Sequence, residues 1–210
     1  MNDGQPSPAF QELMSFGREH SRATLLLATA AHDYAAARCL LFNGMFEGLV
    51  LGAQAIEKTL KAYLLLHEPQ RPAKAIQHHS LPKLLAEAIA IFPHLPLQYF
   101  VSVVEKFRRH YQARYPDNPD ASVSKTTADI RELDELVIFL SENMPCPQIV
   151  TYRAGIYPLI TFSLGYSRTV TTWESWIKQD NNALLPLIPR INGEYAAVME
   201  ALHPTHLTAV

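Results

Sequence analysis

The sequence predicts an all-α domain that ends near residue 145 and is followed by an extension of mixed or irregular structure. Between residues 8 and 143, apolar residues recur at i, i+3, i+4 and i+7, which is the spacing of one face of a helix. Clusters of proline, glycine and polar residues interrupt this pattern, as they do between helices. After Pro145 the helical spacing is lost, and β-branched and aromatic residues become frequent. The extension could therefore contain two short strands or an irregular arm packed on the helices.

The clearest predicted helix spans residues 45–67. Its apolar face comprises Phe46, Leu49, Val50, Ala53, Ile56, Leu60, Tyr63 and Leu64. An alanine-rich helix over residues 20–41 precedes it, and Asn43-Gly44 marks the break between the two. Because the connection is so short, we expect these two helices to lie antiparallel. Glu57 lies four residues before Lys61, an order that favours an ion pair worth about 0.2–0.5 kcal/mol on an exposed face.

Four further helices are expected on either side of this pair. A short one covers residues 8–19, and another begins after Ser80, a favoured N-cap residue, with Pro82 in its first turn and Pro93 beyond its end. Residues 97–114 and 124–143 predict the last two. The helix over 97–114 is basic, with four cations against one carboxylate: Lys106, Arg108, Arg109, Arg114 and Glu105. The helix over 124–143 is acidic, so the two predict either neighbouring solvated faces or a binding surface.

The composition is that of an ordinary water-soluble globular protein. The chain has 210 residues, 48% of them hydrophobic, and a net charge of −2, which argues against dense non-specific binding to nucleic acid. The first residues lack the pattern of a secretory signal, and no apolar run is long enough to span a membrane. Cys39 and Cys146 are too far apart for a metal or redox motif, so we expect a cytoplasmic protein with no metal or cofactor. We divide the chain into an N-terminal segment (1–19), a helical domain (20–145) and a C-terminal extension (146–210).

Four short elements in the helical domain carry a family resemblance. They are Asp33-Tyr34 with Ala37-Arg38; Gln54 to Lys58 with Leu60-Lys61-Ala62; His79 before Leu81 with Leu84-Leu85; and Tyr111 to Asp117. In this order and at this spacing, residues 20–144 resemble the HEPN family, the higher eukaryotes and prokaryotes nucleotide-binding domain. The resemblance implies an up-and-down bundle of about five helices that often dimerises. It also implies binding of nucleotide or RNA, with ribonuclease activity in many members.

That family activity depends on an R-x4–6-H motif, in which histidine can transfer a proton and arginine can hold a phosphate. This sequence departs from the motif. Arg109 is followed five positions later by Arg114, and His110 is adjacent to Arg109 and so points roughly 100° away around the helix. The literal match, Arg71 to His78, lies in a proline-containing loop, and about one such match is expected by chance. The departure favours binding over catalysis.

The basic helix contains the main candidate site. The candidate patch comprises Arg109, His110, Tyr111 and Arg114. His110 and Arg114 are four residues apart, so we expect them to share a face that holds a phosphate, with Tyr111 or Tyr115 stacking on a base. The structural alternative is that Arg114 forms an ion pair or caps the end of the helix, where arginine is favoured in any case.

A second candidate site is a charged pocket between helices that includes Glu57 and Lys61. The structural alternative is a surface pair, or an ion pair of Glu57 with Arg38 or Arg114 across the bundle. We expect His79 to pack against its neighbours or to support the start of the following helix, and we expect no metal at this histidine.

Three functional hypotheses follow. The first is a dimeric HEPN-like module that binds nucleotide or RNA through the basic helix. The second is a metal-independent endoribonuclease of the kind found in toxin–antitoxin pairs, with His110 or His78 as the acid–base group and Arg109 or Arg114 on the phosphate. The third is an interaction protein whose C-terminal arm docks a nucleotidyltransferase, the enzyme that HEPN proteins often accompany.

Overall fold

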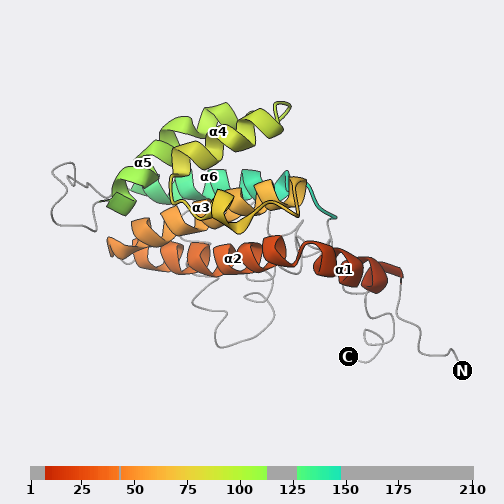
Figure 1. Cartoon of the computed structure of the whole chain (residues 1–210). Coiled ribbons are helices and arrows are strands. Elements are labelled where there is room, and N and C mark those ends of the chain that lie inside the picture. The colour runs from red at the N-terminus through yellow and green to blue at the C-terminus, as the bar shows by residue number, and fades with distance from the viewer. Residues whose placement is uncertain (1–7, 43, 113–126, 148–210) are drawn as a thin grey trace, which may run out of the picture.

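The computed structural model describes residues 8–42, 44–112 and 127–147, and within these ranges all regular structure is helical. The elements are α1 (Pro8–Glu19), α2 (Ser21–Phe42), α3 (Glu47–His67), η1 (Ala73–Ile76), α4 (Leu81–Ile91), η2 (Leu97–Phe100), α5 (Val101–Gln112) and α6 (Thr127–Glu142). In Figure 1, α3 and α6 lie in the middle, α2 on one side and α4 and α5 on the other. The predicted all-α class is confirmed. The predicted strands or irregular arm of the extension lie outside the described residues, except for its first two positions.

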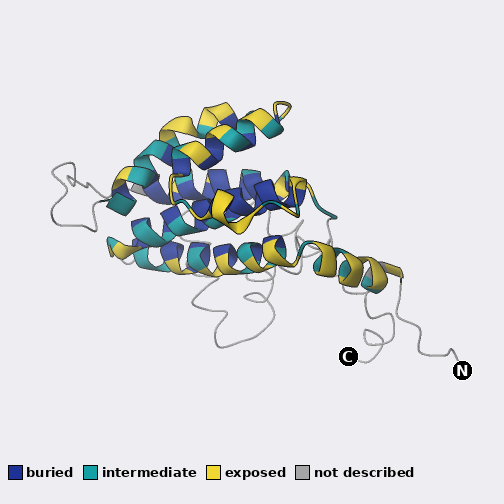
Figure 2. Cartoon of the chain, viewed as in Figure 1, coloured by how far each residue is buried: buried dark blue, intermediate teal, exposed yellow. Residues whose placement is uncertain are grey.

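Helix α3 is the centre of the bundle, because fifteen of its 21 residues are buried (Figure 2). A single predicted apolar face would bury far fewer. The helix is covered from several directions by α2, α4, α5 and α6, so residues outside the predicted face are buried too. They include Glu57 and Lys61, each 7% exposed. The predicted pair of charges is therefore an interior one.

The α2–α3 pair is antiparallel, as its short connection predicts (Figure 1). Gly44 in the turn has a φ of 82°, a conformation that glycine adopts without strain. Gly48 lies so close to α2 that a Cβ there would come within 2.7 Å of the Ala37 carbonyl oxygen. Further along α3, Lys58 forms an ion pair with Asp33, which lies earlier in α2. Residues later in α3 thus contact residues earlier in α2, as expected of antiparallel helices.

A buried polar clamp joins α2 to α6. Asp134 on α6 is fully buried and accepts hydrogen bonds from Arg38 Nε at 2.7 Å and Arg38 Nη2 at 2.8 Å. The Tyr34 hydroxyl donates to the same carboxylate at 2.5 Å. Burial, followed by the charge of Asp134, raises the pKa of Tyr34 well above its ordinary value. Arg38 therefore pairs with Asp134 and not with Glu57, which was the predicted structural alternative.

One predicted helix start is confirmed and one is corrected. Ser80 occupies the predicted N-cap position of α4 in an extended conformation, although its side chain makes no capping hydrogen bond. Its carbonyl oxygen accepts from Leu84 N at 3.0 Å. Residues 97–100 form the 3-10 turn η2, and the α-helix starts only at Val101. No helix within the described residues is long and apolar enough to cross a membrane.

Candidate functional site: a pocket between α3, α4 and α5

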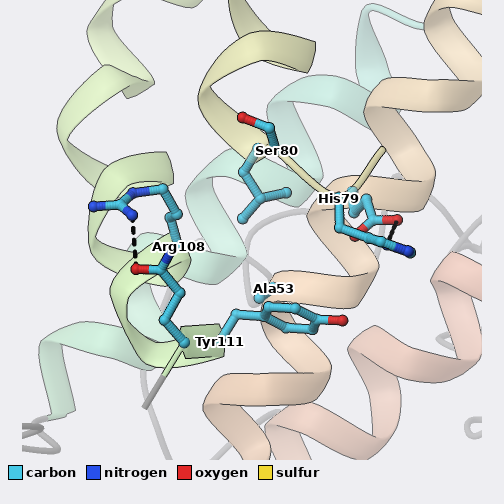
Figure 3. A pocket seen from close by; sticks show the side chains of 8 residues that line it. Ala53, His79, Ser80, Arg108 and Tyr111 are labelled. Carbon is cyan, nitrogen blue, oxygen red and sulfur yellow. Dashed lines mark hydrogen bonds and ion pairs between the residues drawn. The ribbon is translucent and has the colours of Figure 1, made fainter. Parts of the chain in front are cut away.

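A pocket of about 350 Å³ lies where the start of α4 meets α3 and α5 (Figure 3). We call it the α3–α5 pocket. It is lined by Ala53, Glu57, His79, Ser80, Leu81, Arg108, Tyr111 and Gln112. The volume is at the lower end of the range of small-molecule sites, which runs from roughly 300 to 1,000 Å³. Six of the eight lining residues carry polar groups, and Ala53 and Leu81 are apolar.

On the α3 side, Glu57 is the centre of a hydrogen-bonded network. Lys61 Nζ donates to Glu57 Oε1 at 2.7 Å. His79 Nδ1 lies 3.0 Å from the same oxygen and 3.2 Å from Oε2. The side chains of Glu57 and Lys61 are about nine-tenths buried, whereas that of His79 is 65% exposed. The predicted Glu57–Lys61 pair is confirmed, and its carboxylate is well placed to fix the orientation of the exposed imidazole.

On the opposite wall, Arg108, Tyr111 and Gln112 project from the last turn and a half of α5. Arg108 Nε donates to Glu105 at 2.8 Å and Arg108 Nη1 to Gln112 Oε1 at 2.7 Å. The hydrogen bond from Arg108 lowers the pKa of Glu105. Figure 3 shows the Tyr111 ring extending from α5 toward α3, and the Arg108 guanidinium at the outer edge of the pocket beside Gln112.

Of the described residues of the basic helix that were predicted to contact a ligand, only Tyr111, the predicted stacking residue, lines this pocket. Arg109 is exposed and is not a lining residue. His110 is only 6% exposed: with Val104 and Phe107 it belongs to the buried face of α5. Arg114 and Tyr115 lie outside the described residues. The predicted common face of His110 and Arg114 therefore does not hold for His110, because its side chain is turned into the bundle.

His110 occupies a buried polar region between α5 and α6. Its Nε2 lies 3.9 Å from Asp129 Oδ1, too far for a hydrogen bond, and neither ring nitrogen has a hydrogen-bond partner within the described residues. Lys106 approaches the same carboxylate oxygen at 2.5 Å. Burial is the main cause that lowers the pKa of His110, and the charge of Asp129 opposes it. Burial thus disfavours the protonated imidazole.

Arg71 and His78, the literal R-x6-H match, both approach the carboxylate of Glu87. Arg71 forms an ion pair with Glu87 of α4, and His78 Nε2 lies 3.8 Å from the other oxygen of Glu87. Burial lowers the pKa of His78. Neither residue lines the α3–α5 pocket. This arrangement ties the loop before α4 to that helix.

Arg108 and His79 were not predicted as ligand-binding residues, although both line the pocket. Arg108, Tyr111 and Gln112 are spaced i, i+3 and i+4, so helical geometry alone could have grouped them. His79 offered no comparable signal, because its approach to Glu57 depends on how the loop before α4 folds back on α3. No group of three histidine, cysteine or acidic side chains that could hold a metal ion occurs in the described part of the chain.

Comparison with protein families gives one finding. The model of the HEPN domain matches residues 23–141, which is more than half of the chain and extends from α2 to α6. Comparisons with curated proteins and with solved structures gave no match.

Proposed function

The chain belongs to the HEPN domain family, and we propose that its α3–α5 pocket binds a nucleotide or a nucleotide unit of single-stranded RNA. The observation that carries this proposal is the composition of the pocket. One wall presents an aromatic ring, the facing wall presents a buried carboxylate with its attached histidine, and an arginine lies at the rim. These are the groups that bind the face, the edge and the phosphate of a nucleotide.

A base fits the apolar part of the pocket. This part is lined by Ala53 and Leu81, which are 1% and 2% exposed. The Tyr111 ring extends over this region from α5 (Figure 3). Stacking of a base on an aromatic ring contributes about 1–3 kcal/mol and tolerates any base.

The phosphate is proposed to bind at the Arg108 side of the pocket. A phosphate is repelled by Glu57, so the opposite wall is the favourable position for it. The first turn of α4 adds backbone N–H groups at Ser80 and Leu81 that have no acceptor within the helix, and a helix N-terminus favours anions. Glu105 and Gln112 hold the Arg108 guanidinium at the rim of the pocket, where the phosphate of a bound nucleotide would contact it.

The test compares two neighbouring arginines. Binding of AMP and GMP is measured by calorimetry at low and moderate salt for the parent, Arg108→Ala and Arg109→Ala. We expect Arg108→Ala to weaken binding and to reduce its dependence on salt, whereas Arg109→Ala, outside the pocket, leaves both close to the parent. The reverse pattern would refute the pocket and support the exposed basic face.

Metal-independent RNA cleavage is a second candidate, and the observation that favours it is the His79–Glu57 pair. A histidine whose Nδ1 is held by a carboxylate is the usual arrangement of a general acid–base group. We expect any cleavage of labelled RNA by EDTA-treated protein to be lost in His79→Ala and retained in His110→Gln. Loss in His110→Gln alone would assign catalysis to the basic helix.

The dimer and the nucleotidyltransferase partner are further proposals that follow from the family. The mass of the purified chain in light scattering tests the first. Co-purification with a nucleotidyltransferase encoded beside it tests the second.

A further inference from the structure

We infer that the α3–α5 pocket selects guanine and that Glu57 is the residue that discriminates between the bases. This inference rests on the proposed binding of nucleotides, and it adds the identity of the base and the residue responsible.

Glu57 differs from every other polar side chain that lines the pocket. His79, Ser80, Tyr111 and Gln112 carry groups that can donate or accept a hydrogen bond, depending on tautomer or rotation. Arg108 only donates, and all its groups lie at the rim. Of the described side chains that line the pocket, Glu57 alone can only accept. Because the Glu57 carboxylate can only accept, the edge of a base that contacts it must present hydrogen-bond donors.

The carboxylate keeps acceptor capacity for such a base. Lys61 and His79 both make their shorter contacts, 2.7 and 3.0 Å, to Oε1. A carboxylate offers about four lone-pair positions, so Oε2, 3.2 Å from His79, can accept further hydrogen bonds. The His79 side chain is 65% exposed, and turning it toward solvent would free a second position on Oε1 for the base. The Lys61 ammonium is about nine-tenths buried and stays paired with Oε1.

Only guanine satisfies a carboxylate with two adjacent donors. Its Watson–Crick edge presents the N1–H and the N2 amino group side by side, which matches the two oxygens of Glu57 in a bidentate pair. Adenine and cytosine present an amino group next to an acceptor nitrogen, and uracil presents one N–H between two carbonyl oxygens. Each of these bases would place an acceptor against the carboxylate. A good bidentate contact discriminates by roughly tenfold or more between bases.

The depth of the pocket supports this orientation. Glu57 is 7% exposed, so the edge of a base that contacts it is removed from water. A group on that edge that cannot hydrogen-bond to Glu57 cannot bond to water instead. With the edge at Glu57, the ring lies between Ala53 and Tyr111, and the sugar and phosphate extend toward Arg108. Glu57 therefore orients the base of the ligand, and Arg108 orients its phosphate.

The experiment measures the affinities of GMP, IMP, AMP, CMP and UMP for the intact chain by calorimetry. IMP is guanine's nucleotide without the N2 amino group, so it isolates one of the two hydrogen bonds. The variant is Glu57→Gln, whose amide pairs one donor with one acceptor. The matched control is Glu47→Gln, an exposed residue at the start of the same helix. Circular dichroism and thermal unfolding verify that both variants fold.

We expect GMP to bind about tenfold or more tightly than AMP, CMP and UMP, with IMP between them. In Glu57→Gln this preference falls to less than about threefold and the affinity for AMP does not decrease, whereas Glu47→Gln behaves as the parent. If all five nucleotides bind within threefold of one another, the guanine inference is refuted while nucleotide binding stands. A GMP preference that Glu57→Gln leaves unchanged refutes Glu57 as the discriminating residue. If no nucleotide binds, the proposed function fails and the inference fails with it. Should Glu57→Gln not fold, the order of GMP, IMP and AMP on the parent decides the base.

Discussion

Replacing Asp134 with alanine tests whether the polar clamp between α2 and α6 supports the bundle. The substitution removes both carboxylate bonds to Arg38, at 2.7 and 2.8 Å, and the acceptor of the Tyr34 hydroxyl. Arg38 is 2% exposed, so water cannot readily replace the lost partner. Breaking a buried ion pair by removing one member costs about 3–5 kcal/mol. That is a large fraction of the 5–15 kcal/mol by which a typical domain is stable.

The assay is urea unfolding at 25 °C, followed by circular dichroism. With a denaturant dependence of about 2 kcal/mol per molar, the expected loss lowers the midpoint by about 1.5–2.5 M. Asp33→Ala is the matched control on α2, because its ion pair with Lys58 is partly exposed, with side-chain exposures of 19% and 27%. Such a pair contributes about 0–1 kcal/mol.

The result that would refute this reasoning is an equal loss in the two variants. Equal losses would mean that the carboxylate of Asp134 is effectively as well hydrated as that of Asp33. A second comparison replaces the pair together, as Arg38→Met with Asp134→Leu. We expect this double variant to recover most of the stability, because no buried charge is left behind.

Two further predictions concern packing and titration. Gly48→Ala should lower the free energy of unfolding by about 1–3 kcal/mol, because its Cβ would lie 2.7 Å from the Ala37 carbonyl oxygen and 2.8 Å from Leu41 N, both backbone atoms. The control Gly17→Ala, whose Cβ would have nothing within 4 Å, should raise the free energy of unfolding by up to about 1 kcal/mol, as measured by urea unfolding. A similar loss of stability at both positions would contradict the close approach of α2 and α3 at Gly48. The lowered pKa of His110 means that the unfolded chain binds its proton more readily, so stability is full above the ordinary histidine pKa of about 6.5 and is lost as the pH falls toward the folded-state value. His110→Gln should therefore lose less stability than the parent between pH 7.5 and 5.5, and identical slopes would show that His110 does not contribute.

Much of the bundle could be predicted because its helices follow apolar spacing and local end signals. The ranges 8–19, 20–41 and 45–67 agree with α1, α2 and α3 to within two residues at each end. Gly44 was predicted as the break and has the positive φ that such a turn requires. Local chemistry was less reliable at Ser80, which occupies the predicted N-cap position without making the side-chain bond.

The site could be predicted only in part, because its residues meet through tertiary packing. Glu57, Lys61 and Tyr111 were identified from the sequence, and Glu57 and Tyr111 line the pocket. The burial of Glu57 and Lys61 arises from α4 and α5 covering α3, which no pattern within α3 reveals. His110 was predicted to share a phosphate-binding face with Arg114, yet its position six after Val104 and three after Phe107 places it on the buried face of α5.

The most direct test of the pocket is the affinity of a nucleoside monophosphate for Tyr111→Ala compared with Tyr99→Ala. Tyr111 lines the pocket, whereas Tyr99 is 76% exposed on η2 and is not a lining residue. We measure binding of both GMP and AMP by calorimetry, so that the outcome does not depend on the preferred base. Loss of a stacking contact of about 1–3 kcal/mol predicts a roughly 5- to 150-fold weakening in Tyr111→Ala and parent-like binding in Tyr99→Ala. Parent-like binding in Tyr111→Ala would contradict the assignment of the ligand to this pocket.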